Sequence, residues 1–270
     1  MPFTISHAAV ILPFSRPLAR WRMLSAAIIG SMVPDFGWFT PWRPARFETH
    51  SALSLLTFSL PVGLITYWIF QRLIKTPLIE LLPTGAYARW REHAAPADYT
   101  SLLQWFLAAC GVLAGAVTHL VWDAFTHEGA RGVRMIPALD EPLVEIGGHY
   151  LVGVRLLQDG SSLLGLVVVI ALLAYGLRPG HGVESAAPRR LGAGERRAWT
   201  GAYVLTATVL ISVFFLMRLP AASAAHRLAV PIGGAAIAVL RGLAAALFGV
   251  SLCLNLRLHT RPPKDKPALG

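Results

Sequence analysis

The stretch LLQWFLAACGVLAGAVTHLVWDAFTH, residues 102–127, decides the fold of this chain. Residues 102–122 contain no Asp, Glu, Lys or Arg, and they supply the roughly 20 apolar residues that a helix needs to cross a ~30 Å hydrocarbon core. Near the end of this run, His119, Asp123 and His127 recur every four residues, so on a helix they share one face. Two imidazoles and a carboxylate on one face form a ligand set that Zn²⁺ and similar divalent ions accept. Because ionisable groups at membrane depth are costly, this segment is the strongest indication of function.

The composition indicates a membrane protein. Of 270 residues, 55% are hydrophobic and 14% are charged, whereas about 25% of the residues in a soluble domain are charged. A net charge of +10 would favour nucleic-acid binding by a soluble protein, but these basic residues lie mostly in short segments between apolar runs, as topology determinants do. We therefore expect the lipid bilayer, and no nucleic acid, as a partner. Cys110 and Cys253 lie inside apolar runs, which argues against disulfides and thiolate metal ligands.

The apolar runs predict an all-α fold, a polytopic membrane helical bundle with five to six transmembrane helices. Five runs are long enough to span: residues 51–73, 102–122, 160–177, 199–219 and 231–256. A sixth run, residues 23–39, is short and contains Pro34-Asp35. This sixth run either spans the membrane or lies half-embedded against the other helices.

The same pattern predicts a four-part organisation. Residues 1–177 form a helical membrane core that carries the metal site, and residues 178–198 form a basic cytoplasmic linker. Residues 199–256 hold two further transmembrane helices, and residues 257–270 form a flexible basic tail. Helix parity places the basic loop after the first span, the linker and the tail on one side, which the positive-inside rule makes cytoplasmic.

By this topology, the candidate ligands Asp35, His50, His119, Asp123 and His127 all lie near the opposite face of the membrane. Helix ends at a shared depth would let ligands from several elements converge on one ion. Each residue also has a plainer interpretation. The histidines could be hydrogen-bonded core groups, Asp35 could end a helix, His50 could begin one, and Asp123 could form a local ion pair with His119.

His7 depends on the uncertain sixth run. If residues 23–39 span the membrane, His7 lies on the cytoplasmic side, away from the other candidates. If the run folds back instead, His7 can join the site. The sequence leaves both alternatives open.

Five motifs in the first 177 residues carry a family resemblance. They are MPFTISHAAVILP, IGSMVPDF, ETHSALSLLTFSLPVGL, THLVWDAFTHEG and LQDGSSLLGL. Their order and spacing resemble the bacterial family called domain of unknown function 4184, and the last two helices resemble it more loosely. The resemblance implies a multi-pass protein of the bacterial cytoplasmic (inner) membrane, and it implies no established activity.

A more distant likeness concerns the order of the polar residues. His7, Pro34-Asp35, Thr49-His50 and His119-x-x-x-Asp123 together resemble inner-membrane metal-dependent hydrolases, which are similar to zinc-dependent phospholipase C and P1 nuclease. This likeness implies metal roles for those five residues. His127 fits it less closely, because its spacing after the aspartate differs. The chain lacks the histidine density of a three-zinc site, so one or two metal ions are expected.

Two functions follow as hypotheses. The first is a metal-dependent hydrolase that acts on a phosphoester, such as a lipid-linked one, near the membrane surface. It would use a divalent metal, with Zn²⁺ expected, and Asp35 or Asp123 could act as a general base instead of a ligand. The second is a non-enzymatic membrane protein, structural or transporting, in which the same residues form a buried His/Asp hydrogen-bond network.

Overall fold

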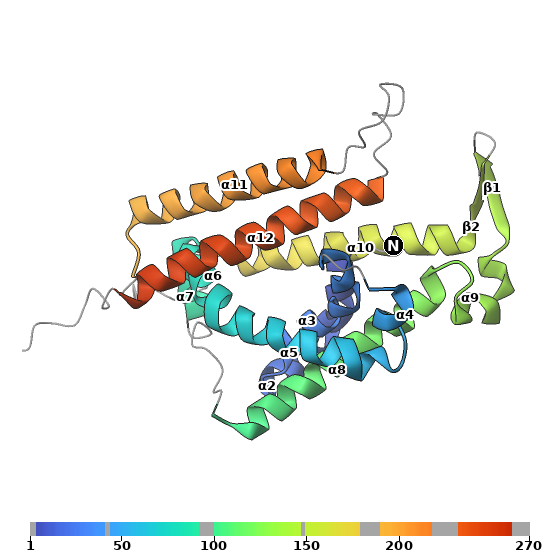
Figure 1. Cartoon of the computed structure of the whole chain (residues 1–270), viewed down its shortest axis with the longest axis horizontal. Coiled ribbons are helices and arrows are strands. Elements are labelled where there is room, and N and C mark those ends of the chain that lie inside the picture. Colours follow the sequence, from blue (N-terminus) through green and yellow to red (C-terminus); the bar gives the residue numbers. More distant parts are fainter. Residues whose placement is uncertain are drawn as a thin grey trace, which may run out of the picture. The chain divides into compact units, whose positions relative to one another are not determined.

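The computed structural model describes residues 4–40, 44–91, 100–146, 149–178, 190–217 and 232–260. Within these residues the protein is helical apart from one short hairpin, which confirms the all-α prediction (Figure 1). Its contacts divide the chain into two compact units. Unit 1 consists of Met1–Trp68 and Asp98–Tyr175, and unit 2 consists of Ile69–Ala97 and Gly176–Gly270.

Four helices in the described part of the chain are long and apolar enough to cross a membrane. They are α8 (Leu102–Thr126), α10 (Gly153–Gly176), α11 (Ala193–Leu216) and the part Ile237–His259 of α12 (Ile232–His259). The prediction of five to six transmembrane helices is therefore corrected to four candidate spans. Residue 219, the predicted end of one span, lies outside the described residues.

The predicted span 51–73 is helical but is not one regular helix. A π-helical turn at Leu55–Ser59 precedes α5 (Leu60–Ile69), and a second π-helical turn, Phe70–Ile74, leads into α6 (Lys75–Leu81). Each π-helical turn ends shortly before a proline, Pro61 or Pro77. Proline lacks the amide N–H that would continue the hydrogen-bond ladder, so the regular α-helix is limited to short pieces.

The uncertain run 23–39 is not among the candidate membrane spans of the described residues. It contains α3 (Leu24–Gly30), of seven residues, followed by the 3-10 turn η3 (Val33–Phe39). Seven helical residues extend only about 10 Å, whereas the hydrocarbon core is ~30 Å thick. Of the two alternatives left open by the sequence, the structure shows the one in which this run packs against another helix, α8.

Small residues allow α3 and α8 to approach closely. A Cβ atom at Gly115 would lie 2.1 Å from the Ala27 carbonyl oxygen, and one at Gly30 would lie 2.2 Å from the Val112 carbonyl oxygen. Side chains at these glycines would therefore force the two helices apart. This contact places Ser31, directly after α3, beside the candidate ligands of α8.

Short elements complete unit 1. They are η1 (Thr4–His7), α1 (Ala8–Ile11), the 3-10 turn Leu12–Phe14, α2 (Ser15–Arg20), α4 (Arg46–Thr49), α9 (Arg131–Met135), the 3-10 turn Pro137–Leu139 and the antiparallel hairpin of β1 (Pro142–Ile146) and β2 (His149–Val152). The hairpin leads directly into α10 (Figure 1). Among the described residues from 4 to 178, this hairpin is the only β-structure.

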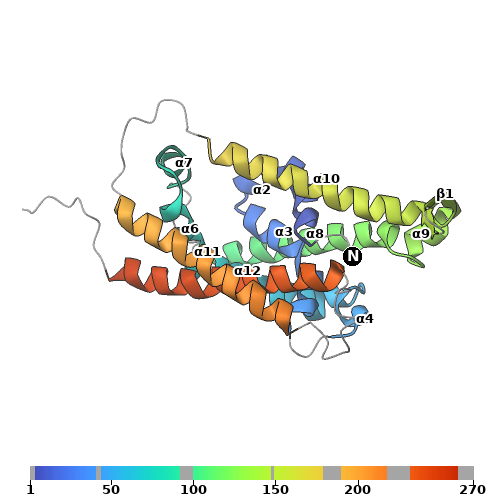
Figure 2. The ribbon, with the colours of Figure 1, turned by 90° about the horizontal axis from the view of Figure 1, so that it is seen from above.

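Unit 2 is built around α11 and α12, which lie side by side in both views (Figures 1 and 2). A hydrogen bond between Tyr203 and Ser251 joins them. The predicted loop before α8 contains a helix, α7 (Thr84–Trp90), and residues 92–99 lie outside the described part. The linker and tail predicted at 178–198 and 257–270 fall partly on undescribed residues, and the four-part organisation stays a prediction.

Candidate metal centre

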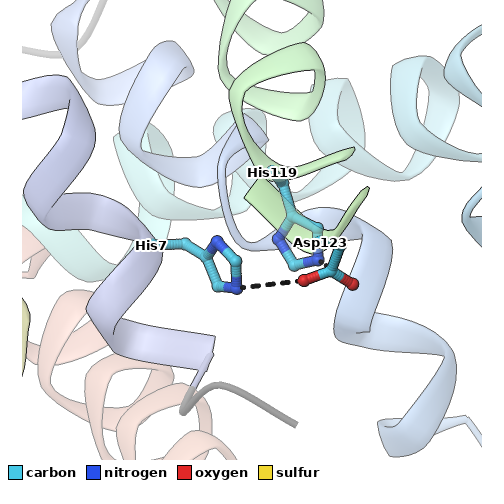
Figure 3. A group of neighbouring side chains, drawn as sticks. All are labelled: His7, His119 and Asp123. Carbon is cyan, nitrogen blue, oxygen red and sulfur yellow. Dashed lines mark ion pairs between the residues drawn. The ribbon is translucent and has the colours of Figure 1, made fainter. Parts of the chain in front are cut away.

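All six predicted ligands lie in unit 1, and the structure brings them together around the end of α8. They are His7 at the end of η1, Asp35 in η3, His50 directly after α4, His119 and Asp123 in α8, and His127 directly after α8. Figure 3 shows three of these side chains: His7 of η1 points toward His119 and Asp123, which both come from α8. The side chains of His7, Asp35, His119 and Asp123 are all buried.

His119 is held by the backbone of the neighbouring helix. Its Nδ1 lies 2.8 Å from the carbonyl oxygen of Ser31. A carbonyl oxygen only accepts hydrogen bonds, so Nδ1 is the donor and the neutral ring carries its lone pair on Nε2. A hydrogen bond of this kind orients metal-binding histidines in many proteins. The close packing of α3 on α8 therefore aims Nε2 of His119 at the two carboxylates.

Four donor atoms surround one point. His50 Nε2 lies 3.5 Å from Asp35 Oδ1 and 3.5 Å from Asp123 Oδ2. His119 Nε2 lies 3.7 Å from the same oxygen of Asp35 and 3.6 Å from the same oxygen of Asp123. In a tetrahedral zinc site with bonds of 2.0–2.1 Å, neighbouring donor atoms are about 3.3 Å apart. The two imidazoles and two carboxylates thus fit the donor set of a single ion site, and their four nitrogen–oxygen separations are close to that value. The donor atoms of Asp35, His50 and His119 form one group, all within 4.8 Å of one another.

These separations are too long for a hydrogen-bonded network. Hydrogen bonds between nitrogen and oxygen are typically 2.7–3.2 Å long. Within the described residues, His7 Nε2, His50 Nε2, His119 Nε2, His127 Nε2 and Asp123 Oδ1 are buried and have no hydrogen-bond partner. Leaving a buried polar atom unpaired costs about 1–3 kcal/mol. A cation between the four donor atoms would satisfy two of these atoms, His50 Nε2 and His119 Nε2, which a purely hydrogen-bonded cluster would leave unpaired.

His7 forms a second, overlapping group with His119 and Asp123. The donor atoms of these three side chains all lie within 4.8 Å of one another, as do those of the group Asp35, His50 and His119. His7 Nε2 is 3.8 Å from Asp123 Oδ1 (Figure 3). Burial, together with the nearby His119, lowers the pKa of His7 to about 4. His7 is therefore neutral at pH 7, the form in which an imidazole can bind a metal.

Asp35 is anchored through both of its oxygens. Oδ2 accepts a hydrogen bond of 2.8 Å from Thr4 Oγ1, and Oδ1 faces His50 and His119. Burial alone would raise the pKa of Asp35, but the interactions with His50, the His119 ring and Thr4 outweigh it and lower the pKa. Asp35 is therefore a carboxylate at neutral pH, as a metal ligand must be.

His50 is oriented by its neighbour in the chain. The hydroxyl Oγ1 of Thr49 lies 2.6 Å from His50 Nδ1. This contact leaves Nε2 to face the carboxylates of Asp35 and Asp123. Thr49 belongs to the motif Glu48-Thr49-His50-Ser51, so one short segment supplies both a candidate ligand and the group that fixes its ring.

His127 lies at the edge of the cluster. Its Nδ1 is 3.2 Å from the backbone oxygen of Asp123 and 3.5 Å from Oδ1 of the same residue. Its side chain is 17% exposed, compared with 6% for Asp123. Burial lowers the pKa of His127 despite the opposing effect of Asp123. The structure brings His127 to the cluster but outside the group of four donor atoms.

Sequence reasoning missed Arg46. Its Nη2 donates a hydrogen bond of 2.9 Å to Asp123 Oδ2, and 46% of its side chain is exposed. A carboxylate oxygen has two lone pairs, so Oδ2 can accept this bond and still face His50 and His119. The available signal was the position of Arg46 four residues before His50. It was obscured because basic residues in such loops are usually topology determinants.

The comparisons with known proteins identify a family without an assigned activity. Neither the curated proteins nor the solved structures include a significant match to this chain. A family model described as Domain of unknown function (DUF4184) matches residues 1–252. That range includes every residue of the cluster and most of α12. The chain therefore belongs to the DUF4184 family.

Proposed function

We propose that this protein is a membrane-embedded, divalent-metal-dependent hydrolase. One observation carries the proposal: His50 Nε2 and His119 Nε2 each lie 3.5–3.7 Å from the same two carboxylate oxygens, one of Asp35 and one of Asp123. These four nitrogen–oxygen distances are close to the donor separations of a zinc site and exceed hydrogen-bond lengths.

The donor chemistry supports one zinc-like ion. Two neutral imidazoles and two carboxylates are ligands that Zn²⁺ takes in tetrahedral sites. The two overlapping groups share His119, whose Nε2 has a single lone pair and can bind only one ion. We therefore assign the ion to Asp35, His50, His119 and Asp123, with His7 and His127 as neighbours that face the other oxygen of Asp123.

The residues around this site would have different roles in hydrolysis. With four protein ligands, a bound divalent ion would take water as a fifth ligand, and it would activate that water and polarise a phosphoryl oxygen. Asp35 is held at both oxygens, which suits a ligand. Among the described residues Asp123 Oδ1 has no hydrogen-bond partner, so this oxygen can take the proton of the attacking water. His7 and His127 border Oδ1 and can stabilise its orientation.

Arg46 favours a phosphoester over a carboxylic ester. Its guanidinium binds Asp123 through one nitrogen and is half exposed, so further donors remain for an anion beside the cluster. Guanidinium groups match the geometry of phosphate oxygens and stabilise the charge that develops on them. A phosphoester substrate would therefore lie between Arg46 and the ion.

The four apolar helices support a location in a membrane. The family resemblance supports the bacterial inner membrane, with the cluster near one surface at the end of α8. A substrate at that depth would be a lipid-like or lipid-linked phosphoester.

Metal analysis of the full chain, purified in detergent, tests the proposal. We expect about one zinc-like ion per chain in the wild type, and its loss in Asp123→Ala. Asp140→Ala is the matched control, because Asp140 is exposed in a turn of the same unit. Full metal retention in Asp123→Ala, or a metal-free wild type after growth with zinc, would support the alternative of a non-enzymatic membrane protein.

A further inference from the structure

A cavity of about 550 Å³ lies in unit 1 between the N-terminal segment and α10. Its volume is within the range of about 300–1,000 Å³ that is usual for ligand pockets. One wall is formed by residues of η1, α1 and the following turn, and the other by α10 with Trp122 of α8. Aliphatic side chains such as Val10, Leu164 and Val168 dominate the lining.

Apart from His7, the polar side chains in this lining already form hydrogen bonds within the protein. Ser6 Oγ donates to the Ser162 carbonyl oxygen over 2.7 Å. Trp122 Nε1 donates to Ser161 Oγ over 3.2 Å, and that hydroxyl donates in turn to the Gln158 carbonyl oxygen. A ligand with many polar groups would find few partners here, so the lining favours an apolar ligand.

His7 is shared between the wall of the cavity and the edge of the metal centre. His7 lines the cavity, and its Nε2 also faces Asp123 Oδ1 at 3.8 Å. Trp122, on the other wall, directly precedes Asp123 in α8. An apolar group in the cavity would therefore place whatever is attached to it beside the unpartnered oxygen of Asp123.

The surroundings of α10 identify the occupant. α10 is one of the four candidate membrane spans, and little of it is buried inside the protein. Its side chains Leu163, Val167 and Ile170 are more than half exposed. In a bilayer these side chains would face hydrocarbon, so lipid acyl chains are the apolar molecules at the highest concentration next to this wall.

We propose that this cavity binds one acyl chain of a membrane phospholipid and so presents the phosphoester of that lipid to the metal centre. The reaction rests on the proposed function, whereas the binding of the chain does not. The proposal names the substrate class of the same centre: a phospholipid whose tail lies between α1 and α10 and whose phosphoester lies between His7 and Arg46.

Photolabelling of the full chain in nanodiscs tests this site. The probe is a phosphatidylglycerol with a diazirine at the end of one palmitoyl chain, and cross-links are mapped by mass spectrometry. Bulk lipid will label the exposed side of α10, so the informative positions are Ala9 and Leu12 on the opposite wall. Val168→Trp fills the cavity, whereas Val167→Trp, one residue away and 53% exposed, is the matched control.

We expect wild type and Val167→Trp to be labelled at Ala9 and Leu12, and Val168→Trp to lose this labelling by about tenfold. A second variant, Ala9→Phe, fills the cavity from the other wall and is read out at Leu12. Unchanged labelling of Leu12 in both filled variants would overturn the proposal, as would equal labelling by a probe with its diazirine on the headgroup.

The two proposals can fail separately, because metal content is measured in the same preparations. If the protein holds no metal but Val168→Trp still loses the labelling that the wild type shows, the acyl-chain site stands and the metal centre is overturned. If the protein retains metal but labelling in Val168→Trp equals that of the wild type, the metal centre stands and the acyl-chain site is overturned. If both stand, Val168→Trp should raise KM for a long-chain phospholipid and leave KM for bis(4-nitrophenyl) phosphate unchanged.

Discussion

The imidazole of His7 stacks on that of His119, with ring centroids 3.8 Å apart and an interplanar angle of 20°. The two residues come from the two separate segments of unit 1, and neither Nε2 has a hydrogen-bond partner. Two protonated rings at this distance would repel each other, so the stack requires at least one neutral imidazole. The low pKa of His7 makes it the neutral member. The stack therefore holds the buried Nε2 atom of the neutral His7 ring, with its lone pair, next to Asp123.

The assignment of the ion to four donor atoms predicts different outcomes for two histidines. His50→Ala removes a donor that lies 3.5 Å from both carboxylates, so we expect the metal to be lost. His7→Ala removes a ring that stacks on His119 and borders Asp123 Oδ1 but supplies none of the four donor atoms, so we expect the metal to be retained and the hydrolytic rate to fall. Metal content and turnover of the two variants provide the check. Loss of metal in His7→Ala would move the ion to the His7, His119 and Asp123 group.

Thr49 should tune metal affinity without binding the metal. Thr49→Val removes the hydroxyl that lies 2.6 Å from His50 Nδ1, so the ring loses its orientation. Loss of such a partner typically weakens metal affinity about 10- to 100-fold. Competition with a chromophoric zinc chelator measures this change. Thr57→Val is the control, because the exposed Thr57 hydroxyl bonds only to a backbone oxygen of its own helix, and an equal loss in both variants would contradict the role of Thr49.

Arg46 should affect turnover more than metal binding. Arg46→Gln removes the charge beside Asp123 and keeps a side chain of similar length, so we expect the metal to remain. Loss of one group that stabilises a developing negative charge costs about 10²- to 10³-fold in rate. Hydrolysis of bis(4-nitrophenyl) phosphate reports this loss.

The control for Arg46 is Arg155→Gln in the same unit. Arg155 also forms an ion pair, with Glu128, but both partners are more than half exposed. Surface pairs of this kind contribute about 0–1 kcal/mol, so little change is expected. A phosphodiesterase rate that is equally low in both variants would show that charge in general, and not the position of Arg46, is responsible.

The contact between α3 and α8 predicts a steric effect on the site. Gly115→Val places a side chain where its Cβ would lie 2.1 Å from the Ala27 carbonyl oxygen, so α3 must move away. We expect a loss of about 1–3 kcal/mol in the free energy of unfolding, and weaker metal binding because Ser31 no longer holds His119. Ala114→Val, on the exposed side of the same helix, should change neither. Thermal unfolding in detergent, with and without zinc, compares the two.

Much of α8 could be predicted from its sequence. The uninterrupted apolar run predicts a long membrane helix, and the interval of four residues places His119 and Asp123 on one face. The small residues of this helix predict close packing, which the structure confirms at Gly111 and Gly115. These features are local, because helix geometry relates residues that are three or four positions apart.

The predicted number of spans was wrong for an equally local reason. Hydropathy counts apolar residues, but it does not register that π-helical turns, which precede Pro61 and Pro77, interrupt the regular α-helix of the first run. In residues 23–39, seven helical residues pack on α8 and do not cross a bilayer.

The sequence by itself determined the kinds of donor atoms, the length of the apolar helices and the shared face of His119 and Asp123. Only the tertiary structure decided that His7 and Asp35 join them, and that Arg46 binds Asp123. The physical reason is that a ligand set from distant segments depends on how helices pack. Here that packing rests on the absence of side chains at Gly30 and Gly115, which lets α3 reach α8 and carries Asp35 to the metal centre.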